Sequence, residues 1–198
     1  GQQQRVAVAR ALASKPTLRK IDASGGPSQV ICESPTQFLR GGFWTAAGQI
    51  VFGAAVTTGG GLFKVDAGSK VATTLTARLE GEGSHSYPVL LPDGRHFLYM
   101  RDRRERGGVH LGSLDLAPSE PPGRKLLSDT ANVAYVPSGV PGRGFVLFVR
   151  EGTLFAQRFD EKRLELDGDP QPVAERVSVA DPDQFALFSA AATGVIIY

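Results

Sequence analysis

The sequence predicts an all-β fold made of repeated, short antiparallel strands. Glycine and proline are abundant, with 24 and 13 residues in a chain of 198. These shares exceed the usual values of about 7% and 5%, which indicates many turns between short elements. Four apolar runs each end in an aromatic residue, and these aromatics lie 47, 49 and 50 residues apart. A unit of roughly 45–50 residues with four strands is typical of a β-propeller blade.

The first segment of the chain, residues 2–14, has a different pattern from the rest. It contains no glycine or proline, and Val6, Ala9 and Ala13 share one face at helical spacing. Pro16 would end such an element. The segment therefore predicts one short amphipathic α-helix ahead of the repeats.

From about residue 18 onward, each unit has the same order of four strands. The first strand contains an aromatic residue and is followed by a turn glycine. The second strand is the apolar run, which is expected to be central. The third strand ends before an Asp, and the fourth is a short apolar strand. The turn glycines are Gly48, Gly94, Gly144 and Gly194. The recurring aspartates, expected to accept hydrogen bonds from turn amides, are Asp66, Asp115 and Asp160. The aromatics expected in the core are Trp44, Phe52, Tyr99 and Phe148.

The repeats divide the chain into complete and incomplete blades. Residues 41–76, 84–128 and 132–177 form full units, whereas 18–32 supplies only the last two strands of a blade and 185–198 only the first two. The prediction is a partial β-propeller (19–198) of about three four-stranded antiparallel blades plus two incomplete ones, after a helical appendage (1–18). Propellers usually close with 4–8 blades. A chain that starts at Gly1 rather than Met is thus expected to be a fragment lacking about half its ring, unless the partial blades pair.

Two family resemblances follow from quoted segments. Residues 18–198 resemble the TolB-like, WD-type propeller region at the C-terminal end of bacterial membrane-anchored Ser/Thr protein kinases, through GGFWTAAGQIVF, SHSYPVLLPDGRHFLYM and FVLFVREGTLFAQRFDEKRLELDGDPQPVAE. That region follows the kinase domain, so the resemblance implies a non-catalytic module of the cell envelope. Residues 1–18, GQQQRVAVARALASKPTL, are similar to the helix after the signature loop of ABC-transporter ATPases. The chain has no G-x-x-x-x-G-K-[ST] loop, and Arg19–Ala23 replaces the expected Asp-Glu strand, so ATP hydrolysis is not supported.

Composition narrows the possible partners. The formal net charge is +2, from 22 Lys and Arg against 20 Asp and Glu, which gives no electrostatic case for nucleic acid. No stretch approaches the ~20 apolar residues of a membrane span, so direct membrane insertion is not expected. Cys32 lies in an apolar run and is expected to be a small buried hydrophobe.

The sequence predicts no catalytic, cofactor-binding or metal-binding residue. His85, His96 and His110 lie on separate strands without the neighbours of a metal site. Ser84, His85 and Asp93 could be drawn as a triad, but the chain lacks the G-x-S-x-G elbow that usually carries the serine.

One charged hairpin tip is a candidate partner-contact loop. Its basic residues are Arg101, Arg103, Arg104 and Arg106. A solvated loop of mixed sign is the simpler interpretation of this segment, and a contact patch for an acidic partner is the functional alternative. The predicted function is a non-catalytic propeller that binds or senses an unidentified protein or small molecule. The alternatives are the accessory propeller of a serine peptidase, or a piece of an ABC-transporter ATP-binding protein.

Overall fold

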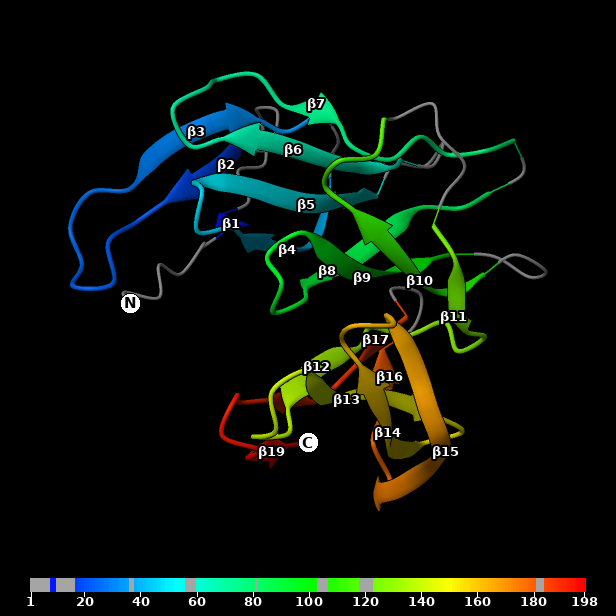
Figure 1. The fold of residues 1–198 in the computed structure, drawn as a ribbon. Coiled ribbons are helices and arrows are strands. Elements are labelled where there is room, and N and C mark those ends of the chain that lie inside the picture. The colour runs from blue at the N-terminus through cyan, green and yellow to red at the C-terminus, as the bar shows by residue number, and fades with distance from the viewer. Residues whose placement is uncertain are drawn as a thin grey trace. The chain divides into compact units, whose positions relative to one another are not determined.

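The computed structural model describes residues 8–9, 17–35, 38–55, 60–80, 82–102, 107–117, 123–180 and 184–198. All regular elements in these ranges are β-strands. These residues contain no helix long and apolar enough to cross a membrane. Figure 1 shows the strands in chain order. The chain forms two compact units: residues Gly1–Pro88 with Leu116–Glu120, and Val89–Asp115 with Pro121–Tyr198.

The first unit contains two antiparallel sheets. One has the order β1-β2-β3 and the other β4-β5-β6-β7. The strands are β1 (Val8–Ala9), β2 (Thr17–Lys20), β3 (Gln29–Glu33), β4 (Phe38–Trp44), β5 (Gln49–Ala55), β6 (Leu62–Asp66) and β7 (Thr73–Thr74). The two sheets share a core of buried apolar side chains from β2, β3, β5 and β6. This core includes Cys32, which is 2% exposed, as its apolar surroundings predicted; burial raises the pKa of its thiol.

The second unit contains two four-stranded antiparallel sheets and two short ribbons. The sheet orders are β11-β10-β9-β8 and β12-β13-β14-β15, and the ribbons are β16-β17 and β18-β19; strand β8 begins in the first unit. The strands are β8 (His85–Leu90), β9 (His96–Arg101), β10 (Gly108–Ser113), β11 (Lys125–Leu127), β12 (Ala134–Pro137), β13 (Arg143–Arg150), β14 (Thr153–Asp160), β15 (Glu165–Ala174), β16 (Val179–Ala180), β17 (Phe185–Ala186), β18 (Ser189–Ala190) and β19 (Ile196–Ile197).

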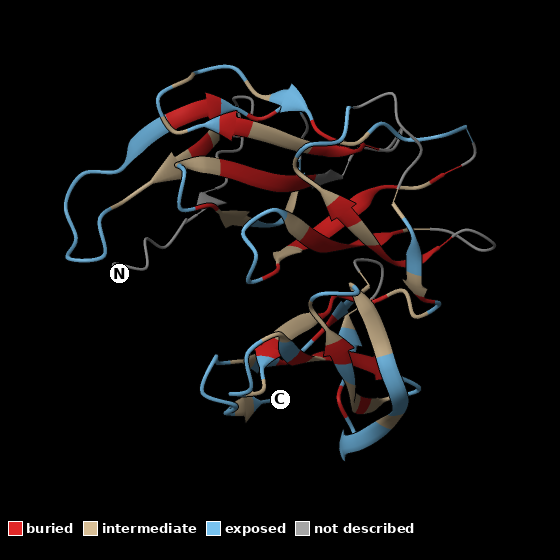
Figure 2. Cartoon of the chain, in the orientation of Figure 1, coloured by how far each residue is buried: buried red, intermediate tan, exposed pale blue. Residues whose placement is uncertain are grey.

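The second strand of each four-stranded sheet along the chain, β5, β9 or β13, contains consecutive buried residues (Figure 2). In β13, Val146 and Phe148 belong to a core shared with the β8–β11 sheet, whereas Leu147 belongs to a core shared with the β16–β19 segment. Successive side chains of a strand point to opposite faces, so one apolar run joins the sheet before it to the sheet after it. This explains why the runs repeat so regularly along the sequence.

Three of the four predicted core aromatics are confirmed. Phe52, Tyr99 and Phe148 are 2%, 0% and 1% exposed, whereas Trp44 is only half-buried against the first-unit core. The difference follows from position, because Trp44 ends the edge strand β4 and the other three lie in central strands.

The predicted N-terminal helix is wrong. Val8 and Ala9, in the middle of the segment, form β1 and pair antiparallel with Leu18 and Thr17. The other residues of 1–16 lie outside the described residues. An isolated helix of this length is marginal in water, whereas the free edge of β2 offers backbone groups that a strand can satisfy. The pairing also places β2 across the predicted boundary at residue 18.

The recurring aspartates have different partners from one sequence repeat to the next. Asp160 Oδ1 accepts hydrogen bonds from the backbone N–H groups of Lys162 and Arg163, both at 2.9 Å, as predicted. Asp66 and Asp115 instead pair with a glutamine and an arginine side chain, respectively. Asp66 and Asp160 are thus the last residues of β6 and β14, whereas Asp115 lies two residues beyond the end of β10, and each of the three makes different bonds.

Candidate binding site

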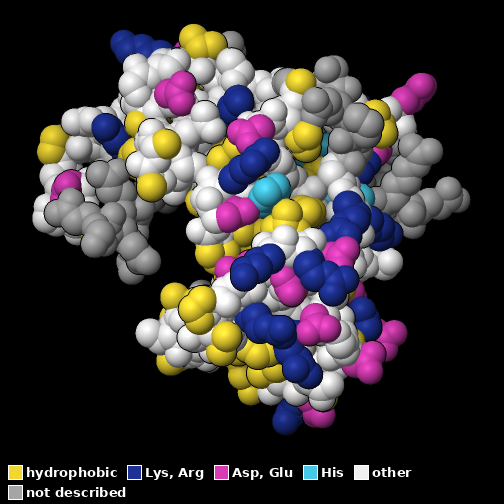
Figure 3. Space-filling model, in the orientation of Figure 1, with side chains coloured by type: hydrophobic (Ala, Val, Ile, Leu, Met, Phe, Trp, Pro, Cys, Tyr) yellow, Lys and Arg dark blue, Asp and Glu magenta, His cyan; other side chains and the backbone are white. Residues whose placement is uncertain are grey.

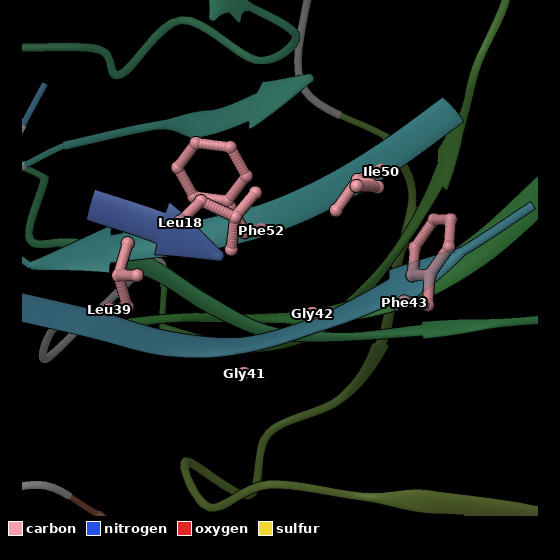
Figure 4. A pocket seen from close by; sticks show the side chains of 7 residues that line it. All are labelled: Leu18, Leu39, Gly41, Gly42, Phe43, Ile50 and Phe52. Atoms are coloured by element: carbon pink, nitrogen blue, oxygen red, sulfur yellow. The ribbon is translucent and has the colours of Figure 1, made fainter. Parts of the chain in front are cut away.

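An apolar cavity of about 270 Å³ lies beside β4 in the first unit (Figure 4). Its lining comes from β2, β4 and β5: Leu18, Leu39, Gly41, Gly42, Phe43, Ile50 and Phe52. Leu18, Ile50 and Phe52 are at most 2% exposed and form its floor. None of the lining side chains is titratable or polar, so the cavity suits an apolar group and offers no acid, base or nucleophile.

Strand β4 has a bulge where it lines this cavity. The register with β5 shifts between Leu39 and Gly42, and Gly41 has φ +71°. A Cβ at Gly41 would lie 3.0 Å from Tyr87 Cα, and one at Gly42 would lie 2.8 Å from Val51 O. The bulge therefore requires glycine at both positions, because a side chain at either one would meet atoms that are already there.

Sequence reasoning did not assign a function to this part of β4. The adjacent glycines Gly41 and Gly42 inside an aromatic-bearing strand were the available signal, because glycine within a strand often marks a bulge. The sequence could not show which side chains from β2 and β5 would line the space.

His85 belongs to a buried structural network. Its ring is 0% exposed, and Nδ1 lies 2.8 Å from Thr76 Oγ1. That hydroxyl oxygen accepts the backbone N–H of Leu62 at 2.8 Å, and His85 Nε2 lies 3.5 Å from Glu82 Oε2. Threonine, histidine and glutamate can form a catalytic relay, but here His85 and Glu82 are buried. These side chains instead stabilise the connection between β6 and β8.

The other two histidines also have structural roles. His110 Nδ1 lies 2.9 Å from Gly123 O, so it carries a proton and donates to that carbonyl. His96 Nδ1 lies 2.5 Å from Asp93 Oδ2 in the β8–β9 hairpin. The carboxylate of Asp93 is thus engaged within its own turn. Among the described residues, no group of three or more potential metal ligands occurs.

Only part of the predicted contact loop belongs to the described residues. Arg101 is the last residue of β9 and is 4% exposed, with Nη1 3.4 Å from His110 Nδ1. Both nitrogens are donors, so this approach is not a hydrogen bond. Its side chain is therefore inside the second unit rather than on a contact surface. Arg103, Arg104 and Arg106 lie outside the described residues.

The β8–β9 hairpin predicts a loss of stability in acid. Asp93 Oδ1 accepts the backbone N–H groups of Arg95 and His96 at 3.0 and 2.9 Å. Partial burial raises the pKa of the Asp93 carboxyl, but the hydrogen bonds from His96 and Arg95 outweigh it and hold the pKa below 3.8. Because the folded-state pKa is the lower one, the stabilisation is present above about pH 4 and is lost as pH falls through the folded value.

We therefore expect Asp93→Asn to lower the free energy of unfolding by about 0.5–1 kcal/mol at neutral pH, a value reduced by solvent screening. The difference from the wild type should shrink below about pH 3. Urea titrations monitored by circular dichroism at several pH values measure this, with the exposed Asp169→Asn as control. A difference that stays constant between neutral and acidic pH would contradict the assignment.

Comparison with solved structures gives three informative likenesses. TolB from Acinetobacter baumannii matches with a TM-score of 0.62 and 18% identity, over 96% of this chain and 44% of that one. Puromycin hydrolase matches with a TM-score of 0.63 and 18% identity, over 96% and 33%. An auxiliary nutrient-binding protein from Bacteroides ovatus matches with a TM-score of 0.58 and 12% identity, over 96% and 42%.

These likenesses show the fold. The chain has a propeller-like all-β fold similar to that of TolB, and it spans less than half the length of each of these proteins. No protein-family model matches the chain, and no curated protein matches it.

Proposed function

We propose that the chain is a non-catalytic binding or sensing module that takes an apolar side chain of an extended partner segment into the cavity beside β4. The observation that carries this proposal is the cavity itself, with its buried apolar floor and glycine wall. Strand β4 is an edge strand, and an edge strand can pair with an added extended segment while a neighbouring pocket selects its side chain.

The parent protein in this proposal is a TolB-like protein, or a bacterial receptor-type Ser/Thr kinase whose extracytoplasmic part contains the propeller. The fold likeness to TolB supports the first and the sequence resemblance supports the second. A location in the cell envelope belongs to the same proposal. Acidic and basic side chains are intermixed on the displayed face of the second unit (Figure 3), which favours a protein or small-molecule partner over nucleic acid.

A second candidate function is the accessory propeller of a serine peptidase. The likeness to puromycin hydrolase, whose name denotes a hydrolase, favours it. An α/β-hydrolase segment encoded downstream in the same gene would support this alternative. A kinase segment encoded upstream would support the receptor-type kinase as the parent protein.

The fluorescence of Trp44 tests the binding proposal. Trp44 is the only tryptophan of the chain and pairs across the strands with Ile50, a cavity residue. We expect an extended peptide of alternating threonine and isoleucine to change its emission saturably, because an isoleucine enters the cavity. The same peptide with aspartate in place of isoleucine should have no effect.

Two variants locate the binding. Leu39→Glu places a charge in the cavity lining and should lower the affinity for the peptide by about 10-fold or more. Val71→Glu makes a comparable change at a valine that is 68% exposed and outside the lining, and should bind normally. A signal that never saturates, or that Leu39→Glu leaves unchanged, would show that the cavity is not a binding site.

A further inference from the structure

The ring of His85 is enclosed between two oxygen-bearing side chains of the first unit. The ring is 0% exposed, and Glu82 beside it is 4% exposed. Nε2 lies 3.5 Å from Glu82 Oε2, and Nδ1 lies 2.8 Å from Thr76 Oγ1. The threonine oxygen already accepts the backbone N–H of Leu62, and its second lone pair can accept another. Both ring nitrogens therefore face acceptors, so the ring fits its place as a doubly protonated imidazolium.

The carboxylate of Glu82 favours this protonated form. Glu82 Oε2 accepts the backbone N–H of Leu79 at 2.8 Å, a bond that stabilises the ionised carboxylate. With a neutral His85 beside it, the pair would leave a net negative charge in the interior, which is costly. One proton on the ring makes the pair neutral as a whole. The pair should therefore keep its proton to a higher pH than a free imidazole, which releases it at about pH 6.5.

Few charged groups among the described residues compete with this pairing. The titratable side chains on the segments around His85 are, besides Glu82, those of Arg40, Arg78, Glu80 and Tyr87. Arg78 and Glu80 are exposed, and Arg78 Nη1 donates to the backbone carbonyl of Glu82 rather than to its carboxylate. Arg40 meets Gly53 of β5 with its backbone carbonyl, and a phenol such as that of Tyr87 is uncharged at neutral pH. Water and ions screen the exposed charges, so the imidazolium is the direct counter-charge of the buried carboxylate.

The start of β8 connects the His85–Glu82 pair to the cavity beside β4. Ser86 packs on Gly53 of β5, where a Cβ would lie 2.9 Å from Ser86 Cα. Tyr87 packs on Gly41, where a Cβ would lie 3.0 Å from Tyr87 Cα, and Gly41 lines the cavity. Tyr87 has φ +51° although it precedes Pro88, a position that favours extended backbone. Its backbone is therefore strained, and its conformation depends on the contacts that hold the residues before it.

We propose that the proton held by His85 and Glu82 regulates the cavity beside β4. With the proton bound, the pair fixes the start of β8 and Tyr87 is held against the β4 bulge. When the proton leaves, the pair carries a negative charge in the interior, the contact weakens, and the strain at Tyr87 is relieved by movement away from Gly41. This rests on the proposed binding function and adds its regulation.

The sign of the pH dependence follows from where the proton binds more tightly. The folded pair holds its proton more tightly than the unfolded chain does, so the stabilisation is complete below about pH 6.5. It is lost as pH rises through the value at which the folded pair releases the proton. The cavity should therefore keep the shape described above in neutral and mildly acidic solution and change in alkaline solution.

Nuclear magnetic resonance of the histidine ring protons measures the proton directly in the full chain. We expect the His85 signals, assigned by their loss in His85→Gln, to titrate with a midpoint above about pH 7. Glu82→Gln keeps the shape of the side chain but removes its charge, and should lower this midpoint by about one pH unit or more. Glu80→Gln, the same change at an exposed carboxylate, should leave the midpoint where it is. A wild-type midpoint at or below about 6.5, or one that Glu82→Gln does not lower, would overturn the proposal.

The emission of Trp44 tests the link to the cavity, because Trp44 pairs across the strands with the cavity residue Ile50. In the free chain, the emission should change with the same midpoint as the His85 signals. The affinity for the threonine–isoleucine peptide should fall by about 10-fold above that midpoint. In Glu82→Gln both changes should move to the lower midpoint, and in His85→Gln both should be absent. Emission that does not follow the His85 titration would show that the proton does not act on the cavity.

The same measurements separate this regulation from the binding function. If the peptide binds equally on both sides of the midpoint, the binding function stands and its regulation by the proton is wrong. If the peptide binds at no pH while Trp44 emission follows the His85 titration, the coupling to β4 stands and the binding function is wrong. Circular dichroism checks that each variant is folded, and the wild type alone decides whether the two midpoints coincide.

Discussion

Replacing Phe148 by alanine is expected to lower the free energy of unfolding by about 4 kcal/mol, within the range for deleting a buried aromatic ring. The ring is 1% exposed and lies in the core shared by the β8–β11 and β12–β15 sheets. It stacks on Phe155 with ring centroids 5.8 Å apart, and the Arg150 guanidinium lies 5.3 Å from its centroid. The variant would leave a cavity between two sheets that cannot close without moving both.

Urea unfolding monitored by circular dichroism measures this loss. The matched control is Phe185→Ala, the same change at a ring that is 38% exposed in the same unit. Its expected cost is about 1 kcal/mol or less, as for most partly exposed positions. Equal costs for the two variants would mean that Phe148 does not lie between packed sheets.

Gly112→Ala is expected to lower the free energy of unfolding by about 2 kcal/mol through overpacking. Gly112 pairs across the strands with Phe97, and a Cβ there would lie 2.4 Å from two carbons of that ring. Phe97 is 0% exposed and its centroid is 5.6 Å from that of Tyr99, so the ring cannot move aside freely. The φ of Gly112 is not positive, so the cost comes from packing rather than from the backbone.

Two comparisons isolate the clash. Gly68→Ala adds the same methyl group where no atom lies within 4 Å, and should change stability little or raise it by a few tenths of a kcal/mol, up to about 1. In the double variant Gly112→Ala with Phe97→Leu, the smaller side chain should relieve the clash, so the two costs should not add. Additive costs would place the effect of Gly112→Ala elsewhere than at the Phe97 ring.

Much of the fold followed from the spacing of apolar runs. The runs containing Phe52, Tyr99 and Phe148 are the second strands of the three four-stranded sheets, as predicted. Between Phe185 and Tyr198 the pattern was less informative, because the chain there forms parts of two short ribbons rather than one strand pair. The N-terminal segment failed as a helix, because its helical spacing does not reveal that β2 offers a free edge.

The candidate site could be predicted only in part. The glycines of β4 indicate a bulge, but Leu18 reaches the cavity from β2, which belongs to another sheet, and Phe52 reaches it from β5. Arg101 also could not be placed from the sequence. It was predicted in a charged contact loop, but in the structure its side chain is buried at the end of β9.

The sequence by itself determined where the strands of the complete sheets lie, how they group into repeated sheets, and which aromatic ends each apolar run. These properties depend on local periodicity, because the alternation of a strand and the chemistry of a turn act over a few neighbouring residues. Only the tertiary structure decided that β1 is a strand, that Arg101 is buried, and that a cavity lies beside β4. Those facts depend on what packs against each face, and packing joins residues that no local pattern connects.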